Sequence, residues 1–138
     1  MKLLLIGVGG VGQSAVMIIK KSGNRGKWLE KMVLADYDFE RAKEVEKLVD
    51  DERFVAEQLN AMKKDDIIAM VKKHKCTFIL NAVAPSFNEY IFEAAFEAGV
   101  GYMDCAMTLS QRHPEKPYEL PHIKLGDLQF AQHEKWEK

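Results

Sequence analysis

The feature that most constrains the fold is a group of glycines near the N-terminus, directly after a short apolar segment. Residues 3–6 are apolar throughout, and residues 7–12 read GVGGVG, which gives the spacing Gly-x-Gly-x-x-Gly. A short apolar run that ends in glycines predicts a strand buried on both faces of a parallel sheet. Apolar residues then return at helical spacing as far as residue 19. The glycines therefore occupy a strand-to-helix turn, and this context predicts a nucleotide-binding turn of the Rossmann type.

Each glycine of this turn has a separate physical task in such a fold. Gly7 allows the tight turn out of the strand, Gly9 lets a pyrophosphate approach the backbone, and Gly12 lets the helix pack against the strand. The N-terminus of the helix offers free N–H groups and a partial positive charge to the phosphates. The expected cofactor-binding positions of the turn are Gly7, Gly9, Gly10, Val11 and Gly12. The alternative is a tight turn that binds no ligand.

Asp36 is the expected acidic partner of the glycine turn, because it ends a second apolar run, residues 32–35. In this fold, an acidic residue at that point accepts hydrogen bonds from the adenosine ribose hydroxyls. A carboxylate repels a 2′-phosphate, so Asp36 favours NAD as the cofactor over NADP. Arg41 lies one helical turn further on, so a 2′-phosphate is still within its reach and NADP stays open. The alternative role of Asp36 is that of a turn or capping residue.

Short apolar runs alternate with segments of helical periodicity along the first hundred residues. Further strands are expected at 54–55, 77–80 and 102–104, and helices are expected after Asp38, after Asp65 and over residues 88–98. This alternation predicts an α/β fold with a doubly wound parallel sheet in the order 3-2-1-4-5. The helix over 88–98 is apolar around most of its circumference, which predicts cover from the sheet and from another subunit or domain.

A loop of small residues follows the fourth expected strand, at the point where the strand order reverses. Ligands of open α/β sheets lie outside the carboxyl ends of the strands at this point. The loop residues are therefore expected beside the nicotinamide half of the cofactor, and Asn81 is expected to bond either a ribose hydroxyl or backbone. They are Asn81, Ala82, Val83, Ala84 and Pro85. The alternative is a plain loop with an asparagine turn.

Residues 4–12, 34–36, 81–85 and 93–104 together resemble the saccharopine dehydrogenase-like family, which includes saccharopine reductases, lysine 6-dehydrogenases and carboxynorspermidine dehydrogenases. The resemblance covers residues 1 to about 105. It implies an NAD(P)-dependent oxidoreductase that transfers hydride at a C–N bond of an amino acid or polyamine precursor. Ser86 and Cys105 depart from the residues common in that family, so the resemblance leaves the substrate open.

The character of the chain changes after Asp104. We expect residues 1–108 to form the NAD(P)-binding domain, and residues 109–138 to form a proline-containing connector and a helix from Gly126 that lead toward an absent substrate domain. The Rossmann fold would then be incomplete at the C-terminus, because a full one has a sixth strand. Asp104 ends the fifth expected strand and is the one candidate catalytic residue, with a loop-capping role as its alternative.

The composition of the chain indicates which classes of binding partner are disfavoured. The 138 residues carry 20 basic and 21 acidic side chains, and this balance points to neither nucleic acid nor an anionic membrane as a partner. No apolar stretch approaches the roughly 20 residues of a membrane span. The four histidines lack ligand-like spacing, so no metal site is predicted. Cys76 and Cys105 adjoin apolar runs and are expected to be buried free thiols of a cytoplasmic protein. The sequence leaves the oligomeric state open, with a homodimer as one possibility.

Two other classes of protein use a glycine turn followed by a distant acid. One is a stand-alone NAD(H)-sensing module, and the other is an S-adenosylmethionine methyltransferase. The asparagine–proline loop and the Tyr-x-Asp strand at residues 102–104 favour the oxidoreductase over the sensing module. The position of Gly12, where close helix packing is required, disfavours the looser turn of a methyltransferase.

Overall fold

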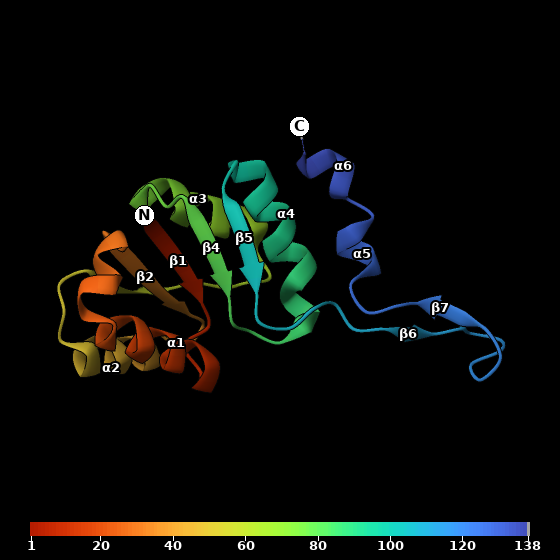
Figure 1. Cartoon of the computed structure of the whole chain (residues 1–138), viewed down its shortest axis with the longest axis horizontal. Coiled ribbons are helices and arrows are strands. Elements are labelled where there is room, and N and C mark those ends of the chain that lie inside the picture. The colour runs from red at the N-terminus through yellow and green to blue at the C-terminus, as the bar shows by residue number, and fades with distance from the viewer. Residues whose placement is uncertain (138) are drawn as a thin grey trace.

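Five parallel strands form the central sheet of the structure, a computed structural model that describes residues 1–137 (Figure 1). Their order is β3-β2-β1-β4-β5, so the predicted doubly wound order is confirmed. The strands are β1 Lys2–Ile6, β2 Lys31–Asp36, β3 Phe54–Gln58, β4 Phe78–Asn81 and β5 Gly101–Asp104.

The central strand β1 is buried on both faces, as its unbroken apolar sequence predicts. Leu4 pairs with Val33 of β2 on one side and with Ile79 of β4 on the other. Leu4 and Leu5 are fully buried although they point to opposite faces of the sheet. The order reverses between β1 and β4, so the carboxyl ends of these two strands flank the point at which ligands of such sheets bind.

Two pairs of helices cover the two faces of the sheet (Figure 1). Helices α1 and α2 pack on one face, and α3 and α4 pack on the other. Their bounds are α1 Gly10–Lys21, α2 Phe39–Val49, α3 Lys64–His74 and α4 Asn88–Ala98. Two 3-10 turns, η1 Gly23–Trp28 and η2 Pro85–Phe87, lie in the connections after α1 and before α4.

The helix ends follow the predicted signals. The Asp38 carboxylate accepts a hydrogen bond from the Arg41 N–H at 3.2 Å and caps the N-terminus of α2. Gly99 follows α4 with a φ of 66°, a left-handed conformation that glycine adopts without strain. These two caps fix where α2 begins and where α4 ends.

The chain after β5 leaves the body of the domain as a hairpin and then returns to α4 (Figure 1). The hairpin consists of β6 Gln111–Arg112 and β7 Pro121–Ile123, and two short helices follow it, α5 Asp127–Phe130 and α6 His133–Trp136. The prediction of one helix from Gly126 was wrong, because Gln132 leaves helical geometry between α5 and α6.

Helix α6 provides part of the cover that the apolar circumference of α4 requires. The Trp136 ring stacks on Phe92 with 4.7 Å between the ring centroids, and it also lies against Phe96. The chain's own C-terminal helix therefore supplies cover that the sequence assigned to another subunit or domain. No helix among the residues described is long and apolar enough to cross a membrane.

Candidate functional site

The glycine turn between β1 and α1 divides into closed and open positions. Gly7 has a φ of 91°, and its N–H donates to the Ala35 carbonyl at 2.8 Å, so the turn is fastened to β2. A Cβ at Gly12 would collide with the carbonyl oxygen of Gly7. A Cβ at Gly9 or Gly10 would meet nothing within 4 Å. The open side of the turn is therefore a backbone cradle at the N-terminus of α1, which fits a pyrophosphate.

Asp36 lies directly against this turn, as the sequence predicts. Its Oδ2 accepts a hydrogen bond from the Val8 N–H at 2.9 Å, and its Oδ1 accepts one from the Asp38 N–H at 3.0 Å. Only 8% of the residue is exposed. The structure thus brings the carboxylate and the glycine backbone together, and hydrogen bonds from two main-chain N–H groups hold the carboxylate in place.

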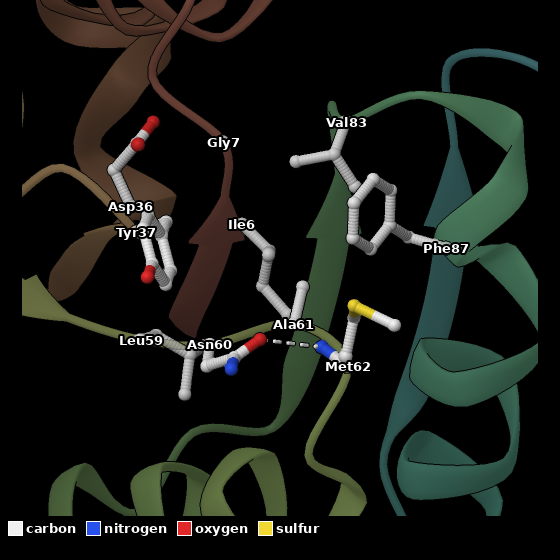
Figure 2. Close-up of a pocket in the computed structure, with 10 residues that line it drawn as sticks. All are labelled: Ile6, Gly7, Asp36, Tyr37, Leu59, Asn60, Ala61, Met62, Val83 and Phe87. Atoms are coloured by element: carbon white, nitrogen blue, oxygen red, sulfur yellow. Dashed lines mark hydrogen bonds between the residues drawn. The ribbon is translucent and has the colours of Figure 1, made fainter.

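A cavity of about 440 Å³ opens beside Asp36, between the ends of the central strands (Figure 2). Asp36 and Tyr37 stand on one side of it, Val83 and Phe87 stand on the other, and the segment after β3 forms its floor (Figure 2). The lining residues are Ile6, Gly7, Asp36, Tyr37, Leu59, Asn60, Ala61, Met62, Val83 and Phe87. The cavity is concave and largely apolar, which suits an adenine ring or another flat heterocycle.

The floor of this cavity was missed by the sequence reasoning. Residues 59–62 follow β3, and β3 carries a weak apolar signal at its predicted position 54–55. Asn60 holds the segment in a turn, because its Oδ1 accepts a hydrogen bond from the Met62 N–H at 3.0 Å (Figure 2). The predicted strand order could have located this floor, because it places the end of β3 beside the end of β2.

A second hollow of about 510 Å³ lies on the other side of the glycine turn, between α1 and α2. Its polar side chains are Gln13, Arg41 and Glu44. The Arg41 guanidinium lies 3.6 Å from the Asp36 carboxylate and 3.7 Å from the Asp38 carboxylate. One exposed cation therefore faces two carboxylates beside the glycine turn.

The Asn81 side chain, predicted to bond either a ribose hydroxyl or backbone, bonds inside the protein. Its Oδ1 accepts from the Val83 N–H at 3.1 Å, and its Nδ2 donates to Asn88 Oδ1 at 2.9 Å and to the Tyr102 hydroxyl at 3.0 Å. The side chain therefore shapes the loop. Of the five loop positions, Val83 lines the cavity, and Ala82 lies against the glycine turn beside Gly7 and Gly12.

Asp104 lies at the end of β5, outside the lining of both hollows. Its Oδ2 accepts a hydrogen bond from Gln129 Nε2 at 2.6 Å. Burial, together with the nearby Asp104 carboxylate, raises the pKa of Tyr102 well above its ordinary value, so the phenol stays protonated. The contacts of Asp104 thus join β5 to α5.

The two cysteines differ in their surroundings. Cys76 is buried as predicted, and burial raises the pKa of its thiol to about 11. The prediction that Cys105 is buried was wrong, because Cys105 is exposed where the chain turns away from the sheet. Among residues 1–137, no group of three or more His, Cys, Asp or Glu side chains is placed to hold a metal ion.

Comparison with solved structures shows the same fold in a dehydrogenase, an epimerase and a reductase. Saccharopine dehydrogenase (L-Glu forming) from Saccharomyces cerevisiae superposes with a TM-score of 0.60 at 12% identity, over 82% of this chain and 22% of that one. UDP-glucose-4-epimerase from Stenotrophomonas maltophila, solved with bound NAD, gives 0.62 at 16% identity over 98% and 48%. Leucoanthocyanidin reductase from Vitis vinifera gives 0.59 at 10% identity over 83% and 38%. The chain thus spans less than half of each of these proteins.

Sequence comparison identifies the family. No curated protein sequence matches the chain. The family described as saccharopine dehydrogenase NADP binding domain matches residues 3–138, which is nearly the whole chain. The cradle at Gly9 and Gly10, with Asp36 beside it, fits the nicotinamide dinucleotide that this family implies. The chain belongs to the saccharopine dehydrogenase NADP binding domain family.

Proposed function

We propose that this chain is the cofactor-binding part of an oxidoreductase that transfers hydride at a C–N bond of an amino acid or polyamine precursor. The observation that carries the cofactor assignment is the open cradle at Gly9 and Gly10, with the Asp36 carboxylate fixed beside it. The substrate class rests on the resemblance of the loop 81–85 and the strand 102–104 to the saccharopine dehydrogenase-like family.

We assign each part of the dinucleotide to a place in the site by the chemistry of the residues that lie there. The N-terminus of α1 receives the pyrophosphate, Asp36 accepts from the adenosine ribose, and the cavity between Tyr37 and Met62 holds the adenine. The loop Ala82–Pro85 then lies toward the nicotinamide half. The bound dinucleotide supplies the hydride acceptor or donor, and the residues of this chain bind and orient it.

The substrate is held, in this proposal, with the help of a further domain. The side chain of Asp104 is engaged by Gln129, and it lies outside both hollows. We therefore assign residues 1–108 to cofactor binding and residues 109–138 to the connection with a substrate domain. NADH formation with saccharopine, lysine or carboxynorspermidine, measured on the protein with its substrate domain, tests the reaction class. Hydride transfer confined to hydroxyl or carbonyl carbons contradicts it, and dinucleotide binding by that protein with no hydride transfer indicates a sensing module.

The charges around the ribose position favour NAD over NADP in our proposal, although the family is described by NADP. The Arg41 guanidinium lies 3.6 Å from the Asp36 carboxylate and 3.7 Å from the Asp38 carboxylate, and Glu44 lines the same hollow. A 2′-phosphate would enter an excess of negative charge there, whereas a ribose diol can donate hydrogen bonds to Asp36.

Asp36→Ser tests this preference. The substitution removes the ribose acceptor and one negative charge, so we expect NADH affinity to fall about tenfold or more while NADPH affinity changes little or rises. Calorimetric titration of both cofactors measures the ratio. Asp65→Ser, which removes an exposed carboxylate from the first turn of α3, serves as the charge-matched control. An equal effect of Asp36→Ser on both cofactors means that Asp36 does not read the ribose.

A further inference from the structure

Two asparagine side chains form a buried amide pair behind the cofactor loop. Asn81 ends β4 and Asn88 begins α4, and the two residues are 1% and 0% exposed. Asn81 Nδ2 donates to Asn88 Oδ1 at 2.9 Å. A buried carboxamide destabilises the fold unless its polar atoms are hydrogen-bonded. The two asparagines therefore require particular bonding partners, which an apolar pair would not.

On one side, the pair sets the loop that follows β4. Asn81 Oδ1 accepts a hydrogen bond from the Val83 N–H at 3.1 Å, which holds the loop backbone in place. Val83 lines the cavity beside Asp36, and its side chain lies where a Cβ on Gly7 would point. The position of the loop against the glycine turn therefore depends on the amide of Asn81.

On the other side, the pair holds the chain that leaves β5. Asn88 Nδ2 donates to the Ala106 carbonyl at 2.6 Å. Two residues later, the N–H and hydroxyl of Thr108 both donate to Gln129 Oε1 at 3.3 Å, and Gln129 Nε2 donates to Asp104. The segment 105–137 is thus fastened at its start to the same amide pair that sets the loop.

The role of Asn88 is distinct from that of a helix cap. The first turn of α4 has no side-chain capping hydrogen bond, although asparagine is a favoured capping residue. Its carboxamide instead bridges two segments from different parts of the chain, through Asn81 and Ala106.

We propose that Asn88 is a positioning residue that couples the loop Ala82–Pro85 to the segment 105–137. A dinucleotide that binds against the positioned loop then stabilises the docked segment, and the docked segment strengthens dinucleotide binding by the same free energy, because such coupling is reciprocal. This inference rests on the proposed cofactor site, and it adds a link between that site and the part of the chain that leads away from it.

Hydrogen–deuterium exchange of residues 105–130, with and without saturating NADH, tests the coupling in the full chain. NADH should slow the exchange of this segment in the wild type and in the control Glu89→Ala, which alters an exposed neighbour on the same helix turn. In Asn88→Ala, the protection should disappear and NADH affinity should fall about tenfold, as for the loss of a buried hydrogen-bonded group. Unchanged protection in Asn88→Ala overturns the proposal, whatever the affinity.

A second variant covers the case in which Asn88→Ala lowers the folded fraction. Asn88→Asp keeps the Oδ1 atom that accepts from Asn81, and it removes the N–H that donates to the Ala106 carbonyl. It should keep the loop contact and lose the protection of the segment, and its NADH affinity should fall only by the coupling free energy, which is less than the fall in Asn88→Ala. Retained protection overturns the coupling. A folded wild type that binds neither NADH nor NADPH would instead overturn the proposed function, and no variant would then respond.

Discussion

At the residue scale, the glycine turn uses its glycines in two ways. Gly7 and Gly12 are required by the packing of the chain on itself, because a side chain at either position would meet neighbouring atoms. Gly9 and Gly10 face open space. The sequence spacing already predicts this division, but it does not identify the atoms that crowd Gly7, because they come from Ala82 and Val83, about 75 residues later.

Gly9→Val and Gly12→Ala should therefore fail in different ways. Gly9→Val should fold, because its Cβ meets nothing within 4 Å, and it should lose dinucleotide binding, because the side chain fills the cradle. Gly12→Ala should lose at least about 1–3 kcal/mol of stability, the usual range for overpacking a tight contact. Thermal unfolding and NADH titration of both variants separate these outcomes. NADH affinity that stays at the wild-type value in Gly9→Val would remove the glycine turn from the site.

The two thiols give a second prediction at this scale. Cys76 is buried and its pKa is raised to about 11, so little thiolate forms at neutral pH, whereas Cys105 is exposed. One thiol per folded chain should react rapidly with a disulfide reagent at pH 8, and the second should react only after unfolding. Cys105→Ser should abolish the rapid phase, and a rapid phase that persists in this variant contradicts the assignment. Cys105 is exposed because the chain turns away from the sheet after an edge strand. The apolar neighbours of Cys105 in the sequence do not predict that turn.

At the element scale, the four long helices and the five strands of the sheet follow from periodicity and caps, while the contacts between them do not. His74 ends α3. Its partner Glu57 lies on β3, and the His74 imidazole and the Lys73 ammonium both contact Glu57 Oε1, at 2.7 and 2.6 Å. The short strands β6 and β7 were missed because two or three residues do not establish a period.

The contact of α3 with β3 predicts a pH dependence of stability. Burial alone would raise the pKa of Glu57, but hydrogen bonds from Lys73 and His74 outweigh it and lower the pKa below its ordinary 4.5. A carboxylate with a lowered pKa stabilises the fold above its ordinary pKa, and this contribution is lost as the pH falls through the lowered value. The unfolding midpoint of the wild type should therefore fall more between pH 6 and 3 than that of Glu57→Gln. Glu52→Gln, an exposed control, should follow the wild type, and equal slopes for wild type and Glu57→Gln would rule out this link.

At the scale of the whole molecule, the strand order decides where the candidate site lies. The reversal between β1 and β4 brings together residues that are far apart in the sequence, from the glycine turn, Asp36 and the loop 81–85. These three segments could be predicted, because each follows a strand and has its own residue signal. The cavity floor at 59–62 and the amide pair of Asn81 and Asn88 could not, because they depend on which strand ends and helices become neighbours in space.

Calorimetric titration of the folded chain with NADH, beside NADPH and S-adenosylmethionine, tests whether the glycine turn holds a nicotinamide dinucleotide. We expect saturable binding of one NADH per chain, weaker binding of NADPH, and loss of both in Gly9→Val while its unfolding midpoint stays near that of the wild type. Absence of binding by either dinucleotide to a folded sample, or tighter binding of S-adenosylmethionine, would contradict this expectation.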